Sequence, residues 1–236
     1  MSFVSGVLLA AGASSRFGSP KMLVPVDESG TTLIRRVIQT WTEAPYEELI
    51  VVVRPEDAAE IEKTLDFFYP AAAVAAADSS KSGGPNPPVK GAQSAPRSGR
   101  RPLTAGFGPP KTRLIPNPLW VAGMFTSVKT GLAAVDAHST HVAVSPADFP
   151  FLRKQSLRAI LSAAESLDDR TLLVPTYLGR RGHPLVFSTA LVPRILSWPD
   201  DRRLSDLFRE SDLRVLPLDG FDDGILRDVD RPDDVR

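Results

Sequence analysis

The chain begins with a short apolar run, residues 4–10, that leads directly into a loop of small and cationic residues. The run has the length and composition of a buried strand, and the loop that follows contains Gly12, Arg16 and Lys21. Backbone N–H groups in such a turn can bind an anion, and two cationic side chains can neutralise a triphosphate. The spacing matches neither a Walker A loop nor the G-x-G-x-x-G dinucleotide fingerprint. An ordinary turn with two solvated cations explains the loop equally well, so by itself it leaves both interpretations open.

Strand-length apolar runs alternate with helical patterns along the chain. We expect strands at residues 4–10, 48–53, 141–145 and 171–175, and helices at residues 32–41, 55–68, 124–135 and 154–166. This alternation is typical of a mostly parallel sheet with helices on both faces. We therefore predict one doubly wound α/β domain over residues 1–236, with its ligand beyond the carboxyl ends of the strands.

Residues 78–113 interrupt this alternation with a segment rich in Pro, Gly and Ser. The segment holds seven Lys and Arg residues and one Asp, so it carries +6 and the rest of the neutral chain carries −6. Such a composition buries too little apolar surface to offset chain entropy, and we predict a disordered surface insertion. A solvated, linker-like insertion is favoured over a basic arm that holds an anionic ligand or partner.

Several classes of function are excluded or disfavoured by composition. The chain has 28 Lys and Arg and 28 Asp and Glu, so no global charge attracts nucleic acid or an anionic membrane. It has no Cys, which excludes disulfides, thiolate catalysis and cysteine-ligated zinc. No apolar run approaches the roughly 20 residues of a spanning helix, and the N-terminus does not have the pattern of a signal peptide. We expect a cytoplasmic protein with no nucleic-acid or membrane partner.

Three carboxylates stand where a divalent cation could be held. Asp148 follows a predicted buried strand, and it could be either a metal ligand or the N-cap of a helix. Asp228 and Asp230 lie on the same side of an extended segment, because side chains alternate with a period of two. Mg²⁺ prefers one or two carboxylates together with substrate phosphates, so these residues are candidate magnesium ligands.

Two further stretches contain candidate substrate contacts. In residues 117–132, Gly123 permits a turn before a predicted helix, and Ser127 lies in the first turn of that helix. This helix start could contact a nucleobase or ribose, or it could be an ordinary helix start. In residues 179–187, Arg181 and His183 stand in a basic turn that enters a strand. His183 is either a substrate contact or a structural turn residue.

Taken together and in order, five stretches resemble the MobA-like nucleotidyltransferase family, and most closely its molybdenum cofactor cytidylyltransferase branch. They are LLAAGASSRFGSPKML, NPLWVAGMFTSVKTGLAAV, PADFP, GRRGHPLVFS and DVDRPDD. The resemblance covers nearly the whole chain outside the insertion. It implies a Rossmann-like domain of the nucleotide-diphospho-sugar transferase type. Such a domain binds an NTP with Mg²⁺, transfers a nucleotidyl group to a phosphorylated acceptor and releases pyrophosphate.

The resemblance and the motifs together give a set of predicted site residues. The predicted catalytic residues are Arg16, Lys21 and Asp148, and the predicted nucleotide-binding residues are Ala10, Ala11, Gly12, Ser14, Ser15, Gly123 and Ser127. The predicted metal ligands are Asp148, Asp228 and Asp230, and the predicted acceptor contacts are Arg181 and His183. Ser145, Pro146 and Ala147 depart from the family, in which a Gly more commonly precedes the aspartate.

The resemblance also suggests the substrates. The Ala10-Ala11-Gly12 form of the first loop is similar to the CTP-using branch, and molybdopterin or the molybdenum cofactor is the implied acceptor. A molybdoenzyme or its chaperone is the protein partner that this assignment implies. Two alternatives stay open: an NTP transferase that acts on a sugar or polyol phosphate, and a nucleotide-binding protein without catalytic activity.

Overall fold

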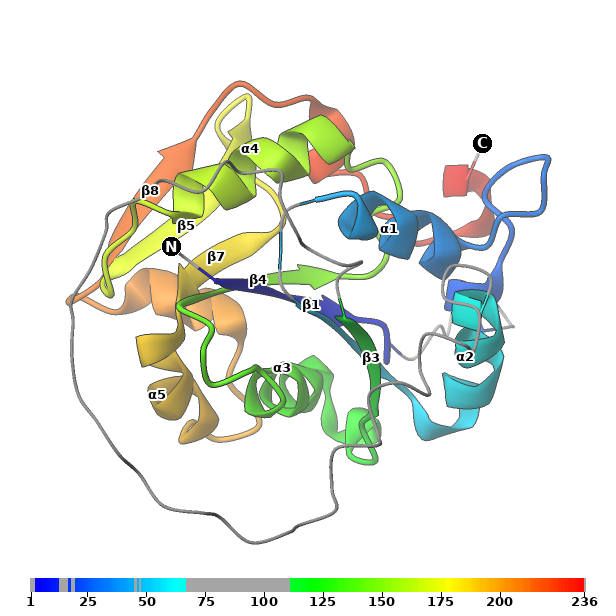
Figure 1. The fold of residues 1–236 in the computed structure, drawn as a ribbon, viewed down its shortest axis with the longest axis horizontal. Coiled ribbons are helices and arrows are strands. Elements are labelled where there is room, and N and C mark those ends of the chain that lie inside the picture. Colours follow the sequence, from blue (N-terminus) through cyan, green and yellow to red (C-terminus); the bar gives the residue numbers. More distant parts are fainter. Residues whose placement is uncertain are drawn as a thin grey trace, which may run out of the picture.

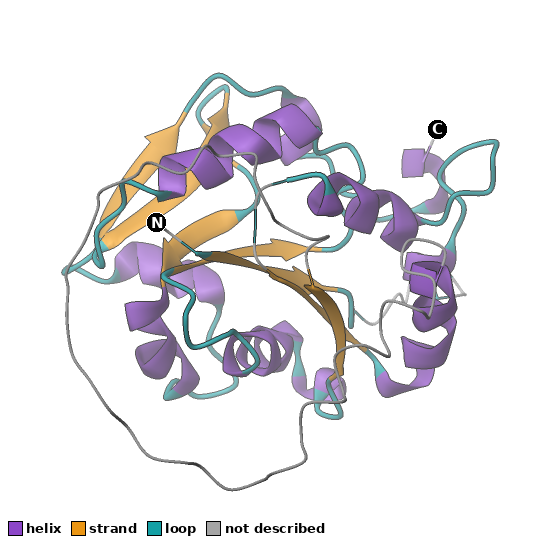
Figure 2. Cartoon of the chain, viewed as in Figure 1, coloured by secondary structure: helices purple, strands orange, loops and turns teal. Residues whose placement is uncertain are grey.

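A computed structural model describes residues 3–12, 17, 20–44, 46, 48–66 and 111–235, and the structural statements below concern these residues. They form an eight-stranded sheet with helices on both faces (Figures 1 and 2). The predicted doubly wound α/β fold with a mostly parallel sheet is therefore confirmed.

The helices and strands follow one another in an α/β order. The strands are β1 (Val4–Leu9), β2 (Glu48–Val53), β3 (Lys111–Pro116), β4 (His141–Pro146), β5 (Thr171–Tyr177), β6 (Arg180–Arg181), β7 (Leu185–Ser188) and β8 (Arg214–Leu218). The α-helices are α1 (Leu33–Thr42), α2 (Ala58–Asp66), α3 (Met124–Ala133), α4 (Lys154–Ala164) and α5 (Val192–Leu196). Two single turns of 3-10 helix matter for the site, η1 (Lys21–Leu23) and η4 (Trp120–Ala122). No described helix has the length and apolar composition needed to cross a membrane.

The strand order across the sheet is β3-β2-β1-β4-β7-β5, and both β6 and β8 pair with β5. Strands β3, β2, β1 and β4 are parallel, whereas β7 runs antiparallel to β4 and to β5. The connection between β5 and β7 is residues 178–184, which is too short for the helical crossover that parallel neighbours need. Strand β7 is therefore reversed.

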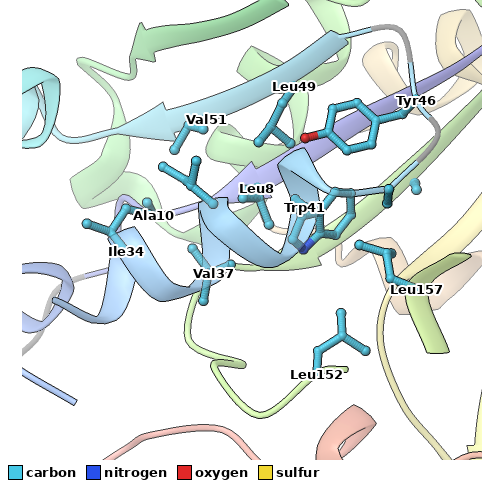
Figure 3. Packing of buried hydrophobic residues seen from close by; sticks show 14 of the residues in the cluster. Leu8, Ala10, Ile34, Val37, Trp41, Tyr46, Leu49, Val51, Leu152 and Leu157 are labelled. Atoms are coloured by element: carbon cyan, nitrogen blue, oxygen red, sulfur yellow. The ribbon is translucent and has the colours of Figure 1, made fainter. Parts of the chain in front are cut away.

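The side chains of the central strands alternate between two apolar cores. Leu8, Leu49 and Val51 pack under α1, and Figure 3 shows Ile34, Val37 and Trp41 of that helix lying over them. The neighbouring positions on the same strands point to the opposite face, where they meet α3 and α5; they are Val7, Leu9, Ile50 and Val52. Burial of both faces explains why these strands read as nearly continuous apolar runs.

The predicted elements agree with the observed ones to within about two residues at most ends. One boundary of the insertion is wrong, because Lys111 and Arg113 belong to β3. Arg113 there donates to Glu48 Oε2 at 2.7 Å, and Glu48 is buried at the start of β2, so this cation is paired with a buried carboxylate. The rest of the predicted insertion, residues 78–110, and the predicted helix end at residue 68 lie outside the described residues.

Helix α3 approaches β1 closely at Gly131. A Cβ atom at this position would lie 2.5 Å from Val7 Cγ1 and 3.1 Å from Val52 Cγ2. We therefore expect Gly131→Ala to lower the free energy of unfolding by about 1–3 kcal/mol, the usual effect of overpacking, measured by urea unfolding. Adding Val7→Ala removes the nearest obstructing atom, so the double variant should lose less stability than the two single changes combined. Helix propensity alone predicts the opposite, a gain of about 1 kcal/mol for Gly131→Ala, and that result would contradict the close approach.

Candidate active site

Two cavities open side by side at the carboxyl ends of β1 and β4. The first has a volume of about 470 Å³, and its walls include Leu9, Ala11, Gly12, Phe17, Lys21, Met22, Trp120, Val121, Gly123, Met124, Ser127, Pro146, Asp148 and Asp230. The second has a volume of about 790 Å³ and extends toward Arg181, His183 and Phe208. Asp148 and Asp230 line both cavities, so the two spaces meet at these carboxylates.

The three predicted metal ligands form one cluster. A carboxylate oxygen from each of Asp148, Asp228 and Asp230 lies within 4.8 Å of those of the other two. The backbone explains this convergence: the Val229 N–H donates to the Asp148 carbonyl at 2.9 Å, and the Val229 side chain is fully buried. With Val229 pointing inward, its two neighbours point together toward Asp148.

Lys21 neutralises part of this cluster. Its Nζ donates to Asp148 Oδ2 at 2.8 Å and lies 3.4 Å from Asp230 Oδ1. The Lys21 side chain is only 10% exposed, so the ion pair is partly shielded from water. The resemblance assigned this lysine to the triphosphate, and in the structure Lys21 lines the first cavity together with Asp148 and Asp230.

The electrostatics and chemistry of the cluster fit a divalent cation. Burial raises the pKa of Asp228, and the negative charges of Asp148 and Asp230 raise it further. Asp148 Oδ1 is buried and accepts no hydrogen bond from the described residues. Oxygen ligands from carboxylates are those that Mg²⁺, Ca²⁺ and Mn²⁺ prefer. An added cation would relieve the repulsion and satisfy the unpartnered oxygen.

The small-residue loop after β1 reaches the first cavity. The Ala10 N–H donates to Val52 O at 2.8 Å, which extends the β1–β2 pairing by one bond and buries the Ala10 side chain. Ala11 and Gly12 then form part of the cavity wall. Of the other residues predicted from this loop, Ser14, Ser15 and Arg16 lie outside the described residues.

The start of α3 forms another wall of the first cavity. Gly123 has φ of +122°, a conformation that L side chains rarely adopt, and the helix begins at the next residue. Ser127 is buried in the first turn and lines the cavity. Its hydroxyl accepts a hydrogen bond from Asn117, a buried residue that the sequence did not identify as part of the site. The one signal for Asn117 in the sequence is its position directly after a strand and directly before Pro118.

The two predicted acceptor contacts line the second cavity. Burial lowers the pKa of His183 to about 4, against the attraction of the Asp228 charge, so the imidazole is neutral at physiological pH. Its ring contacts Phe149 edge to face, with 4.8 Å between the centroids, and its Nδ1 has no hydrogen-bond partner among the described residues. Arg181 makes no ion pair in the described part of the chain, and its guanidinium carbon lies 4.4 Å from the centroid of Phe208. His183 therefore offers a neutral polar contact, and Arg181 a positive charge.

Comparisons with known proteins address the family and the fold of this chain. A model of the MobA-like NTP transferase domain matches residues 6–215. No curated protein sequence matches this chain.

Solved structures with the same fold align with nearly the full length of this chain. Rv0371c from Mycobacterium tuberculosis H37Rv is 20% identical, with a TM-score of 0.65, over 99% of this chain and 95% of that one. A structure of Rv0371c in complex with manganese is 19% identical, with a TM-score of 0.62, over 99% and 95% of the two chains. The 4-diphosphocytidyl-2C-methyl-D-erythritol synthase from Anaerococcus prevotii DSM 20548 is 14% identical, with a TM-score of 0.65, over 99% and 93%. At these identities the likeness shows the fold.

The lowered pKa of His183 gives a prediction about stability and pH. Between the usual value of 6.5 and the folded value of about 4, the unfolded chain binds more protons at this residue than the folded protein does. The free energy of unfolding should therefore fall as the pH is lowered through this range. His183→Gln removes the titrating group, so urea unfolding of that variant should lose less stability than wild type between about pH 7.5 and about pH 5. Each protein is compared with its own free energy of unfolding at the higher pH, which corrects for packing lost in the variant. If wild type and His183→Gln lose the same free energy of unfolding at the lower pH, the lowered pKa of His183 is refuted.

Proposed function

The chain belongs to the MobA-like NTP transferase family, and from that premise we propose that it transfers CMP from CTP to a phosphorylated acceptor and releases pyrophosphate, with Mg²⁺ held by Asp148, Asp228 and Asp230. Nucleotidyltransferase activity follows from the family. The choice of CTP, of magnesium and of molybdopterin as the acceptor is the proposal.

One observation carries this proposal: two cavities meet at one cluster of carboxylates with a lysine beside it. Transfer between two substrates requires a separate space for each and a shared point where the reacting groups come together. We assign the nucleotide to the first cavity, because the loop of Ala11 and Gly12 and the Lys21 side chain line it. The acceptor then occupies the second cavity, beside Arg181 and His183.

The chemistry asks the protein mainly to position groups and to neutralise charge. An oxygen of the acceptor phosphate attacks the α-phosphorus of the NTP, and the bond to pyrophosphate breaks. A phosphate monoester is already ionised near pH 7, so no general base is needed. When bound, the divalent cation supplies charge neutralisation at phosphate oxygens. Lys21 offsets negative charge at the same place, and Arg181 can hold an anionic part of the acceptor.

The walls of the second cavity support an acceptor with a flat or apolar body. Phe125, Val174, Leu185 and Phe208 contribute apolar surface, and Arg181 and Arg203 add positive charge alongside the acidic residues Asp200 and Asp201. A pterin that carries a phosphate combines an apolar ring face with an anion, which suits such walls. A sugar or polyol phosphate makes less use of them. If molybdopterin is the acceptor, a molybdoenzyme or its chaperone is the expected recipient of the product.

Removing the charge of Asp148 or of Lys21, where the two cavities meet, should abolish most of the turnover. We expect Asp148→Asn and Lys21→Ala each to lower kcat by at least about 10², the scale of losing one preorganised electrostatic group. Pyrophosphate release from CTP, Mg²⁺ and the acceptor is the measurement. Asp233→Asn is the matched control, because this exposed carboxylate lies three residues beyond Asp230 and outside the cluster. Near-normal turnover in Asp148→Asn would rule out its role as a metal ligand.

The nucleotide can be identified by thermal shift before any acceptor is known. A ligand that binds only the folded protein raises Tm by mass action, so CTP with Mg²⁺ should raise Tm more than GTP, ATP or UTP does. A larger shift with another nucleotide would replace CTP in the proposal.

The acceptor decides between the remaining alternatives. Pyrophosphate release with molybdopterin and not with sugar or polyol phosphates is the expected result. The reverse pattern would identify a sugar or polyol phosphate transferase. Nucleotide binding without pyrophosphate release from any of these acceptors would indicate a binding protein without catalytic activity.

A further inference from the structure

Asn117 lies in the segment that joins β3 to α3, and it does not itself line the first cavity. It is 1% exposed, and its backbone N–H donates to Val53 O at 2.8 Å, which extends the sheet pairing past the end of β3. Its side-chain Nδ2 donates to Thr126 Oγ1 and to Ser127 Oγ, each at 2.9 Å. A single buried amide therefore connects the edge of the sheet to the first turn of α3.

The surroundings of this amide determine which way it faces. The Leu119 N–H donates to Asn117 Oδ1 at 2.9 Å. If the amide were turned over, its NH₂ group would face that N–H, and two donors would meet in a buried place without an acceptor. The NH₂ group therefore faces the two hydroxyls, and both hydroxyl oxygens act as acceptors.

The two hydroxyls differ in where their own protons can go. Thr126 Oγ1 lies 2.8 Å from Gly123 O and 3.0 Å from Leu119 O, so its proton is used within the loop. Ser127 Oγ accepts from Asn117 and donates no hydrogen bond to any of the described residues. Ser127 lines the first cavity, and Thr126 lines neither cavity. The Ser127 proton is thus the one directed toward the ligand space.

We propose that Asn117 is a positioning residue for nucleotide binding. Its NH₂ group donates a hydrogen bond to the Ser127 oxygen from outside the first cavity, so that the Ser127 hydroxyl donates into the cavity to an oxygen atom of the bound nucleotide. This inference rests on the proposed function and adds a positioning residue to it. A hydroxyl has one proton to donate and two positions at which it can accept. The Asn117 NH₂ group takes one accepting position and offers no acceptor to Ser127, so the Ser127 proton stays available to an acceptor oxygen of the ligand.

The first experiment compares Ser127→Ala with Thr126→Val. Both changes remove one hydrogen bond with the Asn117 amide, but only Ser127→Ala removes the donor at the cavity. With CTP and Mg²⁺ in titration calorimetry, Ser127→Ala should weaken binding about 5- to 10-fold, the effect of one neutral hydrogen bond. Thr126→Val should stay within about twofold of wild type, although its Tm falls as the loop loses a bond. A purely structural role predicts that the two variants weaken CTP to the same extent.

The second experiment keeps Ser127 and reverses the direction of the hydrogen bond between residue 117 and its hydroxyl. Asn117→Asp keeps the acceptor for Leu119 N–H and replaces the NH₂ group with an oxygen, so the Ser127 hydroxyl must donate to it. CTP binding should weaken as in Ser127→Ala, and the double variant should bind CTP no more weakly than Asn117→Asp alone. In steady-state assays the change should appear in KM, with kcat within about twofold of wild type.

The outcomes separate this inference from the function on which it rests. If wild type binds none of CTP, GTP, ATP and UTP, the proposed function and the positioning role both fail. Suppose instead that wild type binds CTP. If Ser127→Ala and Thr126→Val then weaken CTP binding equally, or if the effects of Asn117→Asp and Ser127→Ala on CTP binding are additive, only the positioning role of Asn117 is overturned. Should Asn117→Asp not fold, the comparison of Ser127→Ala with Thr126→Val decides alone.

Discussion

The ion pair between Lys21 and Asp148 is the interaction on which the arrangement of the site depends. Three carboxylates converge within 4.8 Å, and burial, together with the charges of Asp148 and Asp230, raises the pKa of Asp228. The Lys21 ammonium offsets part of that repulsion from a position only 10% exposed, where water screens it little. Its partners lie 127 and 209 residues further along the chain. One side chain thus joins the first loop, the end of β4 and the C-terminal segment.

Much of the fold and of the candidate site could be predicted from local patterns in the sequence. The elements around β1, β2, β4 and β5 follow from apolar periodicity, because strands buried on both faces leave a direct trace in the sequence. The convergence of Asp228 with Asp230 follows from the period of two, and both the carboxylate chemistry and the family resemblance pointed to Asp148 as their partner. Ala11 and Gly12 were also expected at the ligand, and they line the first cavity.

What escaped prediction depends on contacts between distant residues. Strand β7 pairs with β4 as well as with β5, and no local pattern identifies β4 as its neighbour. Arg113 looked like one more solvated cation, because nothing local marks Glu48 as its buried partner. Asn117 looked like a residue held extended by the following proline, and its role becomes visible only when Thr126 and Ser127 are folded against it.

The reversed strand has a consequence for how such a site can change over time. A parallel strand contributes the residues that follow it to the edge where ligands bind, whereas an antiparallel strand contributes the residues that precede it. Arg181 and His183 reach the second cavity in this way, from the short hairpin ahead of β7. The hairpin lies outside the loops that follow β1 and β4. Substitutions in it can therefore change the lining of the second cavity without changing the loops that follow β1 and β4.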